Sequence, residues 1–317
     1  MNCNKVIIWG LRNTWHTHQY IHEALYKAYV HMGYQTYWVN TLNELAETDL
    51  SQSLIIYSGT DCPGDTPPIR EDCFYFFHNS DIYDTIVSKY GSDHAAKFQV
   101  PKTEYTKMPT ASGFANFKQH YIDLVHNTII LPWGTNLIPH EIDENIESLD
   151  KQSTKPIARH VGSLGAGWAK PYQIYAERLA KKYNVPMESK GGYPRVIPEE
   201  QMVPFLKEAL IAPALQFDWQ VEHEYIPCRI FKNISYGKMG ITNNKVVHDL
   251  FDEKLIYDSD LHTLVDKTID FYRKPATEKN TIVRELMIEV RDKHTYVSRI
   301  QAIHMFLKEH KNVNITL

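Results

Sequence analysis

The sequence predicts an α/β fold of two domains, each built on a parallel β-sheet. Its 317 residues fit two domains of about 150 residues. The chain opens with an apolar strand at 6–9, a helix over 17–32 and a strand at 35–39, an order that implies a parallel sheet with a right-handed crossover. This pattern restarts at residue 157, after an acidic and then polar stretch at 140–155 that is typical of an interdomain connection.

The remaining elements continue the alternation of strands and helices. We expect an N-terminal domain at residues 1–140, a C-terminal domain at 155–290, and a C-terminal helix at 291–317 that packs back on the N-terminal domain. Apolar runs predict strands at 54–58, 74–77, 129–131 and 210–215, and helical periodicity predicts helices at 171–183, 198–210, 259–272 and 277–309. Residues 91–120 are polar and weakly patterned, so a loop or lid is expected there.

The composition argues against several classes of partner. The net charge is −4, so no basic field attracts nucleic acid or an anionic membrane. No window approaches the roughly eighteen apolar residues of a transmembrane helix, and the first apolar run is short enough for a strand rather than a signal peptide. The four cysteines form no CxxC pair, which is typical of reduced thiols. We therefore expect a cytoplasmic protein that binds no nucleic acid and has no transmembrane segment.

Residues 222–242, EHEYIPCRIFKNISYGKMGIT, form the stretch around which the rest is organised. An acidic, aromatic loop precedes Pro227, which suits the first position of a helix. Gly237 is expected to end that helix in the left-handed conformation, and residues 239–242 continue as a buried strand. Arg229 lies in the first helical turn, where unpaired N–H groups and the helix dipole favour anions. The stretch therefore predicts a phosphate or diphosphate site.

A glycine-rich loop follows the first strand of the second domain. It reads Gly162-Ser163-Leu164-Gly165-Ala166-Gly167, and glycines allow a close approach of the backbone to a ligand. Its N–H groups are expected to lie near the same phosphates as Arg229. The first loop of the chain carries only Gly10, so it lacks the GxGxxG fingerprint of nicotinamide dehydrogenases.

Two successive Rossmann-like halves joined by an acidic linker resemble the GT-B fold of sugar-nucleotide-dependent glycosyltransferases. The resemblance implies two Rossmann-like domains that face each other across a cleft. Residues 131–136, LPWGTN, resemble the end of such an N-terminal domain, and 160–163, HVGS, the start of its nucleotide-binding partner. Glu224 and Lys232, with seven residues between them, match the spacing of the Glu-x7-Glu element of retaining enzymes, with lysine in the second place. The resemblance implies that Glu224 faces the donor sugar.

Two further resemblances support the same family. Residues 224–233 resemble the GDP-binding element of α1,3-fucosyltransferases, which have a Glu-Lys pair where Cys228-Arg229 stands here. The tail His294-Thr295-Tyr296 with Arg299 resembles the C-terminal helix of spore-maturation-type glycosyltransferases with a family-one-like C-terminal domain. The donor-binding residues expected from these patterns are Gly162, Ser163, Gly165, Glu224, Tyr225, Arg229, Lys232 and Asn233.

The acceptor hydroxyl of an inverting enzyme needs a general base, which we expect from the N-terminal domain. His16 follows the first strand and His78 ends the fourth, and histidine titrates near neutrality. Asp61 and Asp81 occupy neighbouring strand ends, and in open α/β sheets ligands collect at such carboxyl ends. These four residues are the candidate catalytic groups.

No metal or cofactor is expected beyond the donor substrate. Asp258-Ser259-Asp260 has the DxD form that binds metal in the other glycosyltransferase fold, but it precedes a helix, where an N-cap explains it more simply. The prediction is thus a metal-independent glycosyltransferase of the hexosyl or deoxyhexosyl class. Its donor would be a UDP-, GDP- or dTDP-linked sugar and its acceptor a glycan or glycoconjugate. The alternatives are a non-catalytic nucleotide-sugar-binding protein and a sugar-nucleotide epimerase.

Overall fold

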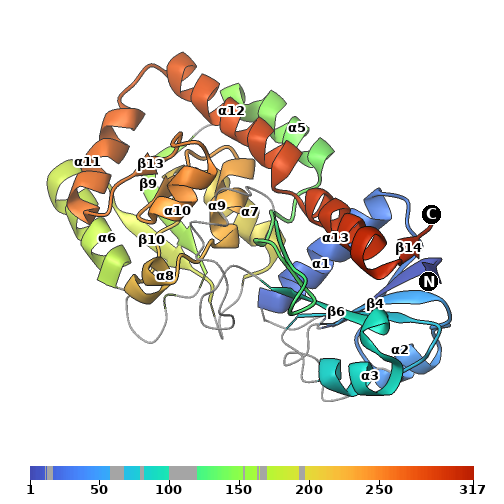
Figure 1. The fold of residues 1–317 in the computed structure, drawn as a ribbon. Coiled ribbons are helices and arrows are strands. Elements are labelled where there is room, and N and C mark those ends of the chain that lie inside the picture. The colour runs from blue at the N-terminus through green and yellow to red at the C-terminus, as the bar shows by residue number, and fades with distance from the viewer. Residues whose placement is uncertain are drawn as a thin grey trace. The chain divides into compact units, whose positions relative to one another are not determined.

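A computed structural model describes the chain as two compact units, each an α/β assembly (Figure 1). The described residues are 1–10, 12, 17–57, 68–78, 82–99, 120–152, 154–162, 164, 170–192 and 197–317. Unit 1 comprises the described residues of Met1–Val100, Gln119–Pro132 and Tyr296–Leu317, and unit 2 those of Trp133–Thr295. The change of unit therefore comes at Pro132, upstream of the stretch at 140–155 that the sequence suggested as the connection.

Unit 1 contains a seven-stranded sheet in the order β3-β2-β4-β5-β6-β8-β7. All pairs are parallel except the edge pair β7–β8. Because β2 and β5 are buried along their whole length, their sequences are continuous apolar runs rather than alternating ones. The strands are β2 (Lys5–Trp9), β3 (Thr36–Val39), β4 (Ser53–Tyr57), β5 (Phe74–Phe77), β6 (Ala95–Gln99), β7 (Tyr121–Asp123) and β8 (Thr128–Ile130).

The C-terminal segment completes unit 1. Helix α13 (Tyr296–Lys311) packs on α1 (Thr17–His31), where His304 Nε2 lies 3.2 Å from the Tyr29 hydroxyl. Strand β14 (Asn314–Ile315) pairs in parallel with β1 (Asn2–Cys3), so the two chain ends lie side by side in Figure 1. The other helices of this unit are α2 (Leu42–Ala46), α3 (Ile82–Tyr90) and the 3-10 helix Ser92–His94.

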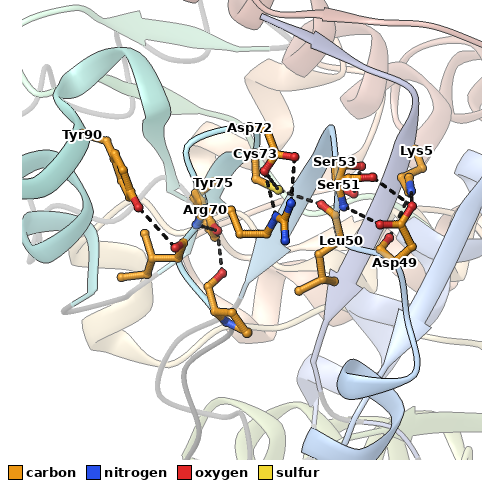
Figure 2. Close-up of polar contacts among 12 residues, drawn as sticks. Lys5, Asp49, Leu50, Ser51, Ser53, Arg70, Asp72, Cys73, Tyr75 and Tyr90 are labelled. Atoms are coloured by element: carbon orange, nitrogen blue, oxygen red, sulfur yellow. Dashed lines mark hydrogen bonds and ion pairs between the residues drawn. The ribbon is translucent and has the colours of Figure 1, made fainter.

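A polar network lies at the amino-terminal ends of β2, β4 and β5 in the unit 1 sheet (Figure 2). Lys5 Nζ lies 2.5 Å from Asp49 Oδ2, and Asp49 Oδ1 accepts from the Ser51 backbone N–H at 3.0 Å. The Cys73 thiol donates to the Leu50 carbonyl at 2.7 Å. Hydrogen bonds from Lys5 and Ser51 hold the pKa of the Asp49 carboxyl well below its ordinary value. These residues lie at the amino-terminal ends of the strands, opposite the carboxyl ends where ligands collect in open α/β sheets.

Unit 2 is built on a parallel sheet in the order β10-β9-β11, with the parallel pair β12–β13 beside it. The Ala214 N–H donates to the Ile241 carbonyl at 2.9 Å and so connects the segment after β11 to β12. The chain enters at β9 and winds outward on both sides, which makes the gap between β9 and β11 the topological switch point. The strands are β9 (Lys155–Val161), β10 (Met187–Lys190), β11 (Ala209–Ile211), β12 (Ile241–Thr242) and β13 (Ile256–Tyr257).

The helices of unit 2 differ from the sequence prediction in two places. Residues 140–148, expected as a linker, lie within helix α5, because Glu141 accepts from the Ile138 backbone N–H and Pro139 opens the helix. The predicted tail helix over 277–309 is two helices that break at His294–Thr295. The helices are α5 (Pro139–Ser148), the 3-10 helix Leu149–Lys151, α6 (Lys170–Tyr183), α7 (Glu199–Lys207), α8 (Asp218–Glu222), α9 (Cys228–Ser235), α10 (Lys245–Leu250), α11 (Leu261–Tyr272) and α12 (Ala276–Lys293).

One part of the segment predicted as a loop is a strand. Residues 95–99 form β6 inside the unit 1 sheet, with Ala95 and Ala96 fully buried. Residues 100–119 of that segment lie outside the described part of the chain. Among the described helices, none combines the length and the apolar character needed to cross a membrane.

Candidate functional site

The carboxyl ends of β9 and β10 are each followed by a glycine. Strand β9 ends at Val161, and Gly162 follows with a φ of +131°. Strand β10 ends at Lys190, and Gly191 follows with a φ of +79°. The Gly162 N–H donates to the Lys190 carbonyl at 3.1 Å, so the two strand ends stay paired beyond their last regular residues. Gly162 and Gly191 thus place no side chain at this carboxyl edge of the sheet, where ligands bind in open α/β folds.

Helix α9 brings Arg229 to this edge. Its apolar face is fully buried through Ile230, Phe231 and Ile234, which fixes the rotation of the helix about its own axis. Pro227 is the N-cap with a φ of −77°, so the helix starts one residue later than predicted. Gly237 follows the helix with a φ of +82°, as the sequence predicted.

The guanidinium of Arg229 lies against the end of β9. Its Nε donates to the Val161 carbonyl at 3.0 Å, and its Nη1 donates to the Tyr172 hydroxyl at 3.2 Å. A Cβ on Gly162 would lie 2.5 Å from Nη2, so the third nitrogen rests directly over the glycine backbone. The contacts between described residues leave Nη2 without a hydrogen-bond acceptor. The arginine can therefore offer Nη2 to an anion at the switch point.

A buried histidine, His160, directly precedes Val161 in β9. His160 is 1 % exposed, and its ring lies 4.2 Å from the ring of Tyr172. Burial, and then the charge of Arg229, lower the pKa of His160 well below its ordinary value. The imidazole is consequently neutral at physiological pH and adds no positive charge to that of Arg229.

Gly162→Ala is expected to displace Arg229. The new methyl group would overlap Nη2, and φ of +131° is a conformation that alanine rarely adopts. We expect the affinity for a diphosphate to fall by about tenfold or more, since one charge-assisted hydrogen bond contributes roughly 1.5–3 kcal/mol. Isothermal titration calorimetry with a nucleoside diphosphate measures this.

Gly91→Ala is the matched control for that substitution. Gly91 has a φ of +88°, but a Cβ there would meet nothing within 4 Å. Both variants should lose thermal stability through backbone strain, and only Gly162→Ala should lose diphosphate affinity. Equal diphosphate affinity in the two variants would contradict the placement of the anion beside Gly162.

Glu224 lies in the loop before α9, within a Schellman motif that ends α8. The Tyr225 N–H donates to the Gln220 carbonyl at 2.9 Å and the Glu224 N–H to the Val221 carbonyl at 3.0 Å. Glu224 is the C′ residue of this motif and has a φ of +52°, where glycine or asparagine is the usual choice. A glutamate in this strained position suggests that its carboxylate has a role that glycine could not fill.

Three buried amides that sequence reasoning missed hold this loop in place. The Gln216 side chain donates to the Tyr225 carbonyl, and Asn244 Nδ2 donates to the same oxygen at 3.2 Å. Asn243 pairs with the Gln216 backbone through bonds of 2.8 and 3.0 Å. Burial raises the pKa of Tyr225, while a hydrogen bond from Trp133 acts in the opposite direction. Tyr225 therefore stays neutral, and its backbone is the anchor of the loop that carries Glu224.

Lys232 lies one turn beyond Arg229 on α9 and is partly buried. Burial lowers the pKa of Lys232 to about 8, against the opposing influence of Cys228 and Glu199, and the charge of Arg229 lowers it further. Residues three positions apart on a helix are neighbours on its surface, so Arg229 and Lys232 can act on one anion. Cys228 is a free thiol at the first position of the same helix.

Asn233 has a structural role, which corrects its assignment as a donor-binding residue. Its side chain is 2 % exposed, and Nδ2 donates to the Ala212 carbonyl at 2.9 Å. This bond ties α9 to the segment that follows β11. Asn233 directly follows Lys232 in the sequence, but on the helix its side chain lies on the face that packs into the core.

Five of the predicted site residues lie outside the described part of the chain. They are Ser163 and Gly165 in the glycine-rich loop and His16, Asp61 and Asp81 in unit 1. His78 is described: its ring is 3 % exposed and stacks on Phe98, with 5.0 Å between the ring centroids. Such burial argues against His78 as the base that meets an acceptor arriving from solution.

No metal centre is found within the described ranges, where no three histidine, cysteine or acidic side chains gather as metal ligands would. Asp260 is the N-cap of α11 and accepts from the Thr263 N–H at 2.8 Å, as the sequence predicted. Asp258 forms an ion pair with Lys267 at 2.9 Å. Both carboxylates of the DxD triplet therefore have structural partners.

Comparison with known proteins gives one family and several solved structures. A family model described as glycosyl transferase-like matches residues 148–305, whereas no curated protein matches the chain. An α-glucosyltransferase (AGT) in complex with UDP matches with a TM-score of 0.62 and 8% identity, over 97% of this chain and 99% of that chain. An α-glucosyltransferase in complex with UDP and a 13-mer DNA containing a HMU base matches with a TM-score of 0.58 and 8% identity, over 97% and 100%. At this identity the likeness is one of fold.

Proposed function

We propose that this protein transfers a sugar from a nucleoside diphosphate to a hydroxyl acceptor, because residues 148–305 match a glycosyl transferase-like family model and the chain has the GT-B fold. The observation that carries the proposal is Arg229, whose Nη2 lies over Gly162 at the switch point of unit 2. The first turn of α9 adds its own N–H groups and dipole. Both suit the diphosphate of a UDP-, GDP- or dTDP-linked sugar.

The chemistry follows from the charges. When the glycosidic bond of the donor breaks, negative charge grows on the leaving nucleoside diphosphate. Arg229 carries a permanent charge and a fixed fork of donors, so it stabilises that charge more in the transition state than in the bound donor. Lys232 adds a second cation one turn away. Glu224 would accept hydrogen bonds from hydroxyl groups of the donor sugar and so orient it.

We propose a glycan or glycoconjugate as the acceptor and no metal as a participant. One of the matched structures has DNA bound, but this chain has a net charge of −4, and a DNA-binding surface gains affinity from lysine and arginine clusters. The donor sugar would be a hexose or a deoxyhexose. The arginine and lysine at α9 supply the positive charge that a divalent cation provides in metal-dependent transferases.

A donor screen tests the proposed function. The chain is incubated with radiolabelled UDP-, GDP- and dTDP-sugars, with and without a mixture of glycans, and with EDTA in a parallel set. We expect one nucleotide to give transfer of label to the glycans, unchanged by EDTA. A new sugar nucleotide formed from the donor alone would indicate an epimerase, and binding without any turnover would indicate a non-catalytic binding protein. Transfer to duplex DNA alone would contradict the glycan acceptor.

Diphosphate affinity should depend on the titration of Lys232. The pKa of its ammonium group is about 8 in the free protein, and a bound anion beside it would raise that value. Binding then takes up a proton above pH 8, so the association constant should be constant near pH 7 and fall as pH rises through 8. The limiting slope is about tenfold per pH unit. Calorimetric titrations with UDP from pH 7 to 9.5 measure this.

Lys232→Met is the control for that pH dependence. Methionine keeps an unbranched apolar stem but cannot titrate, so the variant should bind more weakly at pH 7 and show no decline between pH 8 and 9.5. The phosphate groups of UDP titrate identically in both experiments and cancel in the comparison. The same decline in variant and wild type would remove Lys232 from the site.

A further inference from the structure

Arg229 belongs to a set of hydrogen bonds that spans the switch point. Its Nε donates to the Val161 carbonyl at 3.0 Å, and its Nη1 donates to the Tyr172 hydroxyl at 3.2 Å. The Tyr172 hydroxyl donates in turn to the Leu215 carbonyl at 2.9 Å. Val161 ends β9 and Leu215 lies after β11, so these bonds tie together the segments on both sides of the gap.

Tyr172 is fixed independently of Arg229. It lies on α6 with 1 % of its surface exposed, and its ring packs against the ring of His160 at a centroid distance of 4.2 Å. Because its one proton is directed to Leu215, the phenolic oxygen presents lone pairs to the arginine. A rigid acceptor of this kind restricts the rotation of the guanidinium before any ligand arrives.

We propose that Tyr172 is a positioning residue that holds Arg229 in the orientation that receives the donor diphosphate. The inference rests on the proposed function, because it assigns a role within the same site. With Nε and Nη1 engaged, the nitrogen turned toward the switch point is Nη2 beside Gly162. Loss of the phenolic oxygen frees the guanidinium to rotate, so an anion must order the side chain as it binds. Tyr172 thereby raises diphosphate affinity without touching the ligand.

The test compares Tyr172→Phe with the wild type for two ligands. Calorimetry with UDP, GDP and dTDP first identifies the nucleoside diphosphate that binds, and its parent nucleoside is then titrated in the same way. We expect Tyr172→Phe to weaken diphosphate binding about tenfold and to leave nucleoside binding unchanged, because only the phosphates meet Arg229. A general structural defect would weaken both ligands.

Tyr175→Phe is the matched control on the same helix. Tyr175 is also fully buried, and its hydroxyl donates to Thr268 Oγ1 at 3.0 Å, away from Arg229. Both variants lose one buried hydrogen bond, so both should melt at a somewhat lower temperature. Tyr175→Phe should nevertheless bind the diphosphate as the wild type does.

A double-mutant cycle completes the test. In an Arg229→Ala background, Tyr172→Phe should have no further effect on diphosphate affinity, because the group that it positions is gone. The inference is overturned if Tyr172→Phe binds the diphosphate like the wild type, weakens both ligands equally, or keeps its effect without Arg229. If the wild type binds none of the three diphosphates, the proposed function fails and this inference fails with it.

Discussion

Arg229→Ala is expected to lower kcat/KM for sugar transfer by about 100- to 1,000-fold, which corresponds to roughly 2.7–4 kcal/mol of transition-state stabilisation. The guanidinium lies at the end of β9 with Nη2 over Gly162, where the charge of the leaving diphosphate would develop. Arg229→Lys should have an intermediate rate, because lysine keeps the charge but not the fork of donors. Initial rates with the donor found in the screen give both values.

Arg178→Ala is the control for this prediction. Arg178 is in the same unit and forms an ion pair with Asp266 on α11, so its loss also removes a cation and a hydrogen-bonded partner. Transfer by Arg178→Ala should equal that of the wild type, since a partly exposed ion pair contributes little to stability. Wild-type transfer by Arg229→Ala would remove the arginine from the mechanism.

Glu224→Gly should separate stability from activity. Glycine adopts the φ of +52° at this C′ position without strain, so the free energy of unfolding should stay the same or rise by up to about 1 kcal/mol. Transfer should fall by roughly tenfold to a hundredfold, because hydrogen bonds that a charged carboxylate accepts from the donor sugar contribute about 1.5–3 kcal/mol. Thermal melts and initial rates of the same preparation measure the two effects.

Glu253→Gly provides the comparison, because Glu253 is also a glutamate with positive φ, at +61°, and is exposed. It should gain stability in the same way and keep full activity. If both variants are fully active, Glu224 has no catalytic function, and its conformation is simply an unfavourable helix end. Glu224→Gln tests the charge alone and should lose activity without gaining stability.

The sequence predicted the fold well where burial is complete. The apolar runs of β2, β4 and β5 identify the central strands of unit 1, because strands covered on both faces contain few polar residues. It failed for β6, whose sequence AAKFQ is small and mixed and becomes a strand only through pairing with β5 and β8. The break at His294 was also missed, because residues 277–309 contain no glycine or proline that would have predicted it.

That break has a tertiary cause. The His294 ring is 1 % exposed and stacks on Phe231 at 4.6 Å, while its carbonyl accepts from the Thr135 N–H at 3.0 Å. Contacts with residues far away in the sequence therefore end α12, and no local signal accompanies them. The boundaries of the two units could not be predicted for the same reason, because Tyr296–Leu317 belongs to unit 1 through contacts with residues far away in the sequence.

The charged residues of the candidate site could be predicted from the sequence, but the residues that hold them in place could not. Arg229, Gly162 and Glu224 lie in local patterns that chemistry can interpret: a helix start, a strand end and an acidic loop. Tyr172 is 57 positions from Arg229, and only the fold brings its hydroxyl to the guanidinium. Asn233 shows the reverse, since its neighbours suggested a ligand contact that the rotation of the helix prevents.

A crystal structure of the protein with UDP, or with the diphosphate that the donor screen selects, tests the central claim most directly. The account predicts a phosphate oxygen about 2.7–3.1 Å from Arg229 Nη2, beside the Gly162 backbone, with the Nε bond to Val161 and the Nη1 bond to Tyr172 retained. A diphosphate bound elsewhere in the molecule, with Arg229 still over Gly162 and free of the ligand, would contradict it.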